Sequence, residues 1–113
     1  MTVKPNIPAA EALELTALIS HTDGGIASRV MARAGGGSAT LFAFDVGQEL
    51  SEHTAPYDAL VIVLEGTLVL KIGKTSVRAG SGTVVRIPAN APHAVKSHDR
   101  SKMLLVMLRG RDT

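Results

Sequence analysis

Two histidines, His53 and His93, are the residues of this chain best suited to chemistry. Each lies on a stretch punctuated by glycine and proline. A neutral imidazole can bind a metal ion, and it can also take up or release a proton near neutral pH. The chain contains no cysteine, which excludes thiolate catalysis, thiolate–zinc sites and disulfides. The pair therefore indicates either a metal site or a proton-transfer site.

Short β-strands are the elements that must position these histidines. Runs rich in β-forming residues occupy positions 26–34, 38–45, 60–72, 76–77, 83–87, 93–97 and 103–108. Glycine and proline turns separate them, a pattern typical of a sandwich or barrel. Residues 60–70 are almost continuously apolar, as expected for a strand covered on both faces. Gly66 interrupts this run and predicts a bend.

The spacing around both histidines follows a pair of family motifs. In the first, G-x5-H-x-H-x3-E-x6-G, the chain supplies Gly47, His53 and Gly66 but has Ala55 at the second histidine and Ala59 at the glutamate. In the second, G-x5-P-x-G-x2-H-x3-N, it supplies Gly82, Pro88 and His93 but has Asn90 at the glycine and Ser97 at the asparagine. On these residues the chain resembles the cupin superfamily. The resemblance implies an all-β jelly roll, the cupin double-stranded β-helix barrel.

The resemblance also implies a metal site, because cupins typically hold a metal on three histidines and one glutamate. Here only His53 and His93 of that set are present, and a catalytic zinc or iron site normally needs about three protein ligands. A third ligand would have to come from a residue outside the motif positions. The candidates are Glu49, Tyr57, Asp58 and His98. A divalent ion (zinc, nickel, manganese or iron) and a metal-free pocket are therefore weighed equally.

The jelly roll predicts that both imidazoles face one interior pocket. The other pocket residues expected from strand alternation and motif position are Phe44, Ala55, Ala59, Val61, Val63, Met103 and Met107. Alanine at two ligand positions removes charge and enlarges the space, which favours a mostly neutral, partly apolar guest. Some sugar-modifying cupins resemble this arrangement and move protons with histidine and tyrosine. By that resemblance Tyr57 is the candidate proton donor beside His53 and His93.

The bulk properties fit one globular domain. The chain has 113 residues, of which 45% are hydrophobic and 19% charged. We divide it into residues 1–25, a tail with a short helix or edge strand, and residues 26–113, the barrel. Residues 9–19 have high helix propensity. The net charge is +2 with scattered cations, and there are only three aromatic residues, which argues against nucleic acid. With neither a signal peptide nor a membrane span visible, we expect a cytoplasmic protein.

Three functions are compatible with these residues. The leading hypothesis is a protein that binds a small molecule in a barrel pocket around His53 and His93, with catalysis left open. The alternatives are a metal-dependent isomerase, epimerase or oxygenase, and a sensory or interaction module. The doubly apolar strand at residues 60–64 and the exposed edges of a small sandwich also predict a homodimer.

Overall fold

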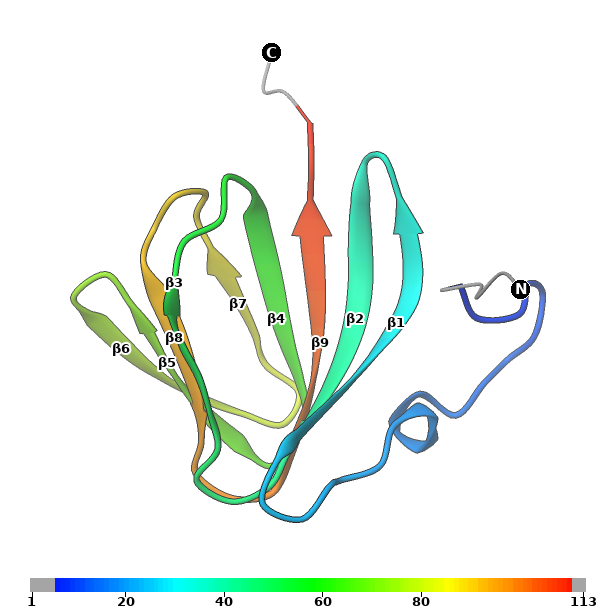
Figure 1. Ribbon diagram of the computed structural model, residues 1–113, viewed down its shortest axis with the longest axis horizontal. Helices are drawn as coiled ribbons and strands as arrows, with labels where there is room; N and C mark the ends of the chain where they lie inside the picture. Colours follow the sequence, from blue (N-terminus) through cyan, green and yellow to red (C-terminus); the bar gives the residue numbers. More distant parts are fainter. Residues whose placement is uncertain (1–5, 111–113) are drawn as a thin grey trace.

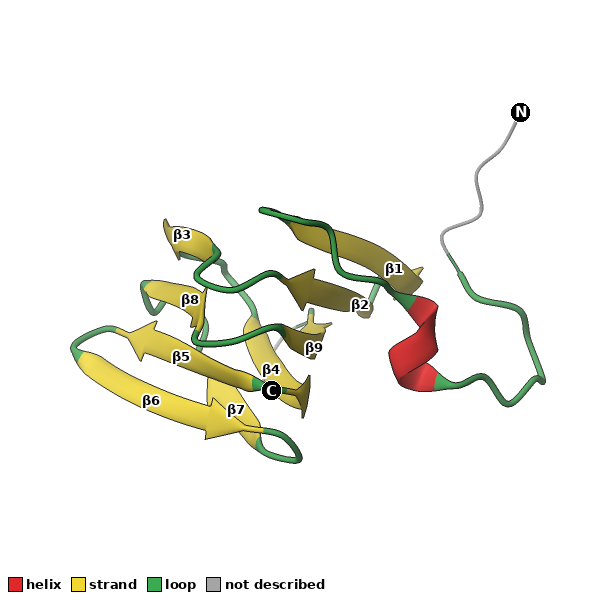
Figure 2. Cartoon of the chain, turned by 90° about the horizontal axis from the view of Figure 1, so that it is seen from below, coloured by secondary structure: helices red, strands yellow, loops and turns green. Residues whose placement is uncertain are grey.

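The computed structural model describes residues 6–110, which form nine β-strands and one short 3₁₀ helix. The strands are β1 (Ile26–Ala34), β2 (Gly37–Phe44), β3 (Glu49–His53), β4 (Asp58–Glu65), β5 (Thr67–Ile72), β6 (Thr75–Gly80), β7 (Val84–Ile87), β8 (His93–Ser97) and β9 (Ser101–Leu108). They build two antiparallel sheets, ordered β1-β2-β9-β4-β7 and β3-β8-β5-β6. The sheets face each other, converging at the lower end of Figure 1 and separating at the upper end; Figure 2 views them from below. The predicted all-β jelly roll is confirmed.

The bend predicted at Gly66 separates β4 from β5 and carries the chain from one sheet to the other. Gly66 has φ +73°, a left-handed conformation that residues with a Cβ rarely adopt. A Cβ at this position would also collide with the carbonyl oxygen of Arg100 and with the side chains of Asp99 and Ser101. Glycine is therefore required here for two independent reasons.

Of the short helix or edge strand considered for the N-terminal segment, the structure contains only the 3₁₀ helix at Leu15–Leu18. Ala10 has φ +60°, which is incompatible with a right-handed helix through that residue. The apolar side chains of the segment instead pack on the outer face of the five-stranded sheet, around Leu41 and Ala43. The backbone N–H of Ile7 donates to the carbonyl of Met31 in edge strand β1. Tertiary packing thus outweighs the local helix propensity.

The main hydrophobic core lies between the two sheets. Its buried members are Phe44, Ala59, Val61, Val63, Leu68, Leu70, Ala79, Ile87, Val95 and Met103. In β4 the buried residues alternate with half-buried ones, because successive side chains point to opposite faces of a strand. Within residues 6–110, no helix is long and apolar enough to cross a bilayer.

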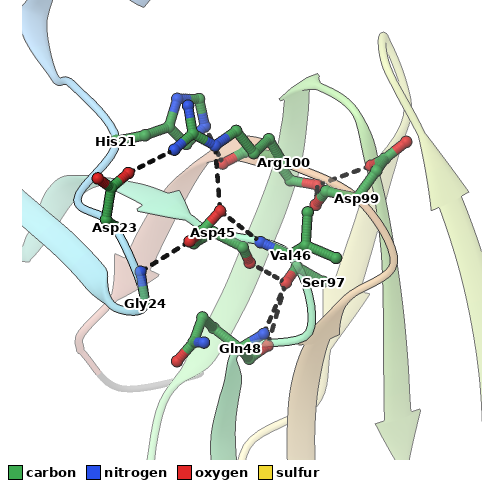
Figure 3. Close-up of polar contacts among 10 residues, drawn as sticks. His21, Asp23, Gly24, Asp45, Val46, Gln48, Ser97, Asp99 and Arg100 are labelled. Carbon is green, nitrogen blue, oxygen red and sulfur yellow. Dashed lines mark hydrogen bonds and ion pairs between the residues drawn. The ribbon is translucent and has the colours of Figure 1, made fainter.

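A network of ion pairs and hydrogen bonds closes the lower end of the barrel (Figure 3). Arg100 binds Asp23 at 2.8 Å through Nη2 and Asp45 at 3.0 Å through Nε. The N–H of Gly24 donates to the Asp45 carboxylate at 2.7 Å, and the N–H of Val46 donates at 2.9 Å. These interactions, led by the Gly24 hydrogen bond, lower the pKa of Asp45 to about 2.

Buried Ser97 extends this network inward. Its hydroxyl donates to the carbonyl of Asp45 and accepts from the N–H of Gln48 at 3.0 Å. Across residues 6–110, every fully buried side-chain nitrogen or oxygen has a hydrogen-bond partner. At the lower end, the buried polar groups are therefore all hydrogen-bonded, and this network links the starts of β1 and β3 to the ends of β2 and β8.

Candidate functional site

His53 and His93 lie together at the upper end of the barrel, as the sequence predicts. They are paired residues on neighbouring strands, His53 ending β3 and His93 beginning β8. Their ring centroids are 4.3 Å apart, and the ring planes are inclined by 60°. His93 is buried, with 8% of its surface exposed, whereas His53 is exposed on an edge strand. Two residues forty positions apart thus form one imidazole pair.

An irregularity in β3 allows His53 to face inward. Leu50 pairs with Val95 and His53 pairs with His93, so β3 takes three steps where β8 takes two. In a regular strand, residues three apart point to opposite faces. The extra residue, at the position of Ser51 or Glu52, is a β-bulge that resets this alternation. Leu50 and His53 consequently both line the same cavity.

Backbone carbonyls determine the tautomer of both rings. Nδ1 of His53 lies 2.9 Å from the carbonyl oxygen of Ser51, and Nδ1 of His93 lies 2.9 Å from that of Ala91. A carbonyl oxygen can only accept, so Nδ1 must carry the hydrogen in each ring. In a neutral ring Nε2 is then a lone-pair acceptor, and neither Nε2 has a partner among the described residues. Both imidazoles thus present the same unpaired acceptor.

A cavity of about 200 Å³ lies beside the two imidazoles. It is lined by side chains from both sheets: Phe42, Leu50, His53, Val61, Ile87, His93, Val95, Met103 and Leu105. Seven of these nine residues are apolar, and none is lysine or arginine. The histidines therefore supply the only ionisable side chains along an otherwise apolar wall.

The predicted pocket residues fall into three groups. Val61 and Met103 line the cavity. Phe44, Ala59 and Val63 are buried in the core without lining it. Ala55 lies beyond β3, where its carbonyl accepts from the N–H of Asn90, and Met107 borders a shallower groove at the β1–β2 hairpin.

Sequence reasoning missed several lining residues. These are Phe42, Leu50, Ile87, Val95 and Leu105. Strand alternation alone could have found Leu105, Phe42 and Val95, which lie two residues from Met103, Phe44 and His93 on the same strands. The others depend on how far each strand extends toward the open end, which the sequence pattern does not specify.

Tyr57 lies in the loop between β3 and β4 and does not line the cavity. The guanidinium of Arg109 sits over its ring, 5.0 Å from the ring centroid. This cation–π contact holds the tyrosine against the C-terminal end of β9. Its role as a proton donor stays a prediction.

The residues considered as a third metal ligand do not join the histidine pair. The Asp58 carboxylate accepts from the N–H of Ala89 at 2.9 Å and binds Arg86 at 3.0 Å; the Ala89 hydrogen bond is the main cause of its lowered pKa. Glu49 is exposed at the opposite end of β3, and His98 follows β8 at the lower end.

No cluster of three or more potential metal-ligating side chains occurs within residues 6–110. A firmly bound catalytic ion needs about three protein ligands, and this site offers two imidazoles. The described donor set therefore does not fit the metal centre that the motif resemblance implies.

Comparisons with known proteins agree with this architecture. The family model described as "Cupin domain" matches residues 40–108, which is more than half of the chain. The chain belongs to the cupin superfamily. None of the curated protein sequences matches this cupin.

Several solved structures are similar to this cupin. A conserved Streptococcus pyogenes protein of unknown function is 30% identical, with a TM-score of 0.88 and coverage of 99% of this chain and 98% of that one. A cupin superfamily protein from Desulfitobacterium hafniense is 28% identical, with a TM-score of 0.86 and coverage of 93% and 96%. A cupin 2 conserved barrel domain protein from Leptotrichia buccalis is 31% identical, with a TM-score of 0.83; the match covers 86% of this chain and 47% of that one.

Proposed function

We propose that this cupin binds a small, largely apolar molecule in the barrel cavity, with His53 and His93 contacting its polar group. The observation that carries the proposal is the combination of two partnerless Nε2 acceptors with seven apolar side chains around one cavity. Apolar pockets with a few convergent polar groups are the usual form of small-molecule sites. The cavity volume, about 200 Å³, suits a guest of roughly one ring, since about 150 Å³ of dry apolar space holds benzene.

Proton transfer is the chemistry that this pair favours if the bound molecule is also a substrate. Imidazole is a common general base and acid near neutral pH. A hydrogen of the guest placed against Nε2 of either ring would be the one removed. Tyr57 could return a proton only after leaving its contact with Arg109.

A cavity-filling variant tests the binding proposal. Val95→Phe places a ring in the cavity, whereas Val69→Phe adds the same ring to β5 outside the cavity lining. Small neutral ring compounds should shift the NMR signals of the His53 and His93 rings in the wild type and in Val69→Phe, but not in Val95→Phe. If the wild type responds to none of these compounds, or if Val95→Phe responds equally, the proposal is wrong.

The metal-dependent isomerase, epimerase or oxygenase alternative needs a third ligand from outside the described cluster. We therefore assign no reaction step to a metal. Metal analysis of the purified protein discriminates the two hypotheses: near-stoichiometric metal that is lost in His53→Ala would favour the enzyme. The interaction-module alternative predicts that a different protein co-purifies, whereas recovery of the homodimer alone would count against it.

We also propose that two copies associate through the outer face of the five-stranded sheet. The N-terminal segment covers this face over β1 and β2 and reaches Leu64 and Leu104. Beyond it, a stripe of apolar side chains on β4, β7 and β9 is partly or largely exposed. Its members are Leu60, Ile62, Val84, Val106 and Leu108. Strand pairing places Leu60 opposite Val106 and Ile62 opposite Val84, so the stripe is continuous.

Analytical ultracentrifugation tests this association with a matched pair of variants. Val84 is 60% exposed within the stripe, and Val46 is 58% exposed outside it. Val84→Lys should weaken the dimer, whereas Val46→Lys should leave it intact. A monomeric wild type, or equal behaviour of the two variants, would contradict the proposed surface.

A further inference from the structure

The ligand must bring a hydrogen-bond donor to the imidazole pair, and this inference rests on the proposed function. Because Nδ1 of each ring donates to a backbone carbonyl, each neutral ring can offer only a lone pair at Nε2. A carbonyl, ether or carboxylate group of a ligand would place its own lone pairs against these atoms. A hydroxyl group, in contrast, can donate to either Nε2.

The burial of His93 makes this requirement stronger. Only 8% of its surface is exposed, yet its Nε2 is not among fully buried atoms without a partner. This nitrogen therefore keeps some solvent exposure. A guest that displaced water from Nε2 without replacing its hydrogen bond would leave a desolvated acceptor, which is unfavourable.

The remaining cavity surface disfavours an anion. Its other seven side chains are hydrocarbon or thioether groups, and no lysine or arginine lines it. Two arginines of the upper end are already engaged, Arg86 with Asp58 and Arg109 with the Tyr57 ring. A charged group placed here would lose its hydration without gaining a counter-ion.

We infer that the natural ligand class is a compact, uncharged hydroxyl compound of about one ring, such as a phenol, an enol or a cyclic alcohol. The hydroxyl hydrogen is donated to Nε2 of His53 or His93, and the hydrocarbon part fills the cavity. Anionic metabolites and purely hydrocarbon guests are disfavoured for opposite reasons. The first lack a cation, and the second leave both acceptors without a donor.

Phenol, toluene and benzoate are probes that separate these cases, because phenol and toluene differ by hydroxyl against methyl at nearly constant size. Binding is measured by NMR titration at about pH 8.5, where free imidazole is neutral, with EDTA present to remove metal ions. The variants His53→Phe and His93→Phe replace each acceptor by an apolar ring. His98→Phe makes the same change at an exposed histidine that does not line the cavity.

In the wild type and in His98→Phe, phenol should bind at least as tightly as toluene. The affinity for benzoate should be lower than that for phenol by a factor of at least about ten. The ratio of phenol to toluene affinity should fall about fivefold in whichever of His53→Phe and His93→Phe removes the accepting Nε2, which corresponds to one lost hydrogen bond. His53→Phe lies on an exposed edge strand, and should His93→Phe fail to fold, His93→Leu removes the same acceptor with a smaller side chain.

Two results would overturn the ligand class while leaving cavity binding intact. One is a ratio of phenol to toluene affinity that is unchanged in both His53→Phe and His93→Phe; the other is benzoate binding as tightly as phenol. If neither phenol nor toluene binds the wild type, the cavity-binding function itself is wrong as well.

Discussion

The two ends of the barrel use polar side chains in opposite ways. At the lower end, Arg100, Asp45 and Ser97 satisfy one another and the neighbouring backbone (Figure 3). At the upper end, His53 and His93 each make one bond to a carbonyl, and within residues 6–110 the second nitrogen of each ring has no partner. A saturated network stabilises a fold, whereas unpaired acceptors beside a cavity are available to a guest. The lower end therefore serves stability, and the upper end is where we propose that the ligand binds.

Gly66→Ala should produce the largest loss of stability, because it changes a residue whose backbone conformation and close contacts at the lower end require glycine. The added Cβ would adopt an unfavourable positive φ and collide with the backbone of Arg100. We expect a loss of at least about 2–3 kcal/mol in the free energy of unfolding, measured by urea denaturation. Gly35→Ala is the matched control, because its Cβ would meet no atom within 4 Å. Equal stability of the two variants would show that the bend tolerates a side chain.

Ser97→Ala and His53→Ala compare the two ends directly. Ser97→Ala leaves the N–H of Gln48 and the carbonyl of Asp45 without their shared partner, so we expect a loss of about 1–3 kcal/mol. His53 is exposed, and its removal should change the unfolding free energy by no more than about 0.5 kcal/mol. Urea denaturation measures both. A larger loss for His53→Ala would reverse the roles assigned to the two ends.

Acidification should weaken the lower end through Asp45. Its pKa is lowered from 3.8 to about 2 in the folded protein, so the folded state binds fewer protons than the unfolded state between these values. The stability it contributes is therefore present above about pH 4 and is lost as the pH falls toward 2. In Asp45→Asn the free energy of unfolding should change less steeply over this interval. Identical pH profiles for variant and wild type would contradict this assignment.

Added metal should have the smallest effect. Because the described site offers two imidazoles, zinc, nickel, manganese or iron should bind weakly and be lost on dialysis. Elemental analysis after dialysis should find far less than one ion per chain, and any rise in melting temperature should disappear in His53→Ala. One retained ion per chain would mean that a further ligand completes the upper end.

Much of the architecture is predictable because the signals are local. Runs of β-forming residues predict β1, β2 and the start of β4 to within a residue or two, and the glycine at position 66 predicts the turn between β4 and β5. The convergence of His53 and His93 follows from motif spacing. The fold therefore required little information beyond short-range patterns and family resemblance.

The missed features depend on interactions between distant segments. Strand β3 has one half-buried residue among four exposed ones, so it lacks the alternation that identifies a strand. Residues 9–19 have helical propensity but are held extended or in a 3₁₀ turn by packing on β2. The cavity lining depends on the register between strands, which explains why Val61 was predicted and Ile87 was not.

Because of the irregularity in β3, the number of residues between Leu50 and His53 and their pairing with β8 together determine the orientation of the His53 side chain. The five positions between Gly47 and His53 include one residue more than plain pairing with β8 would need. If β3 kept all its residues but lacked the bulge, the imidazole would turn outward, because Leu50 and His53 are three residues apart. The backbone of this short edge strand therefore decides which side of the sheet the histidine faces.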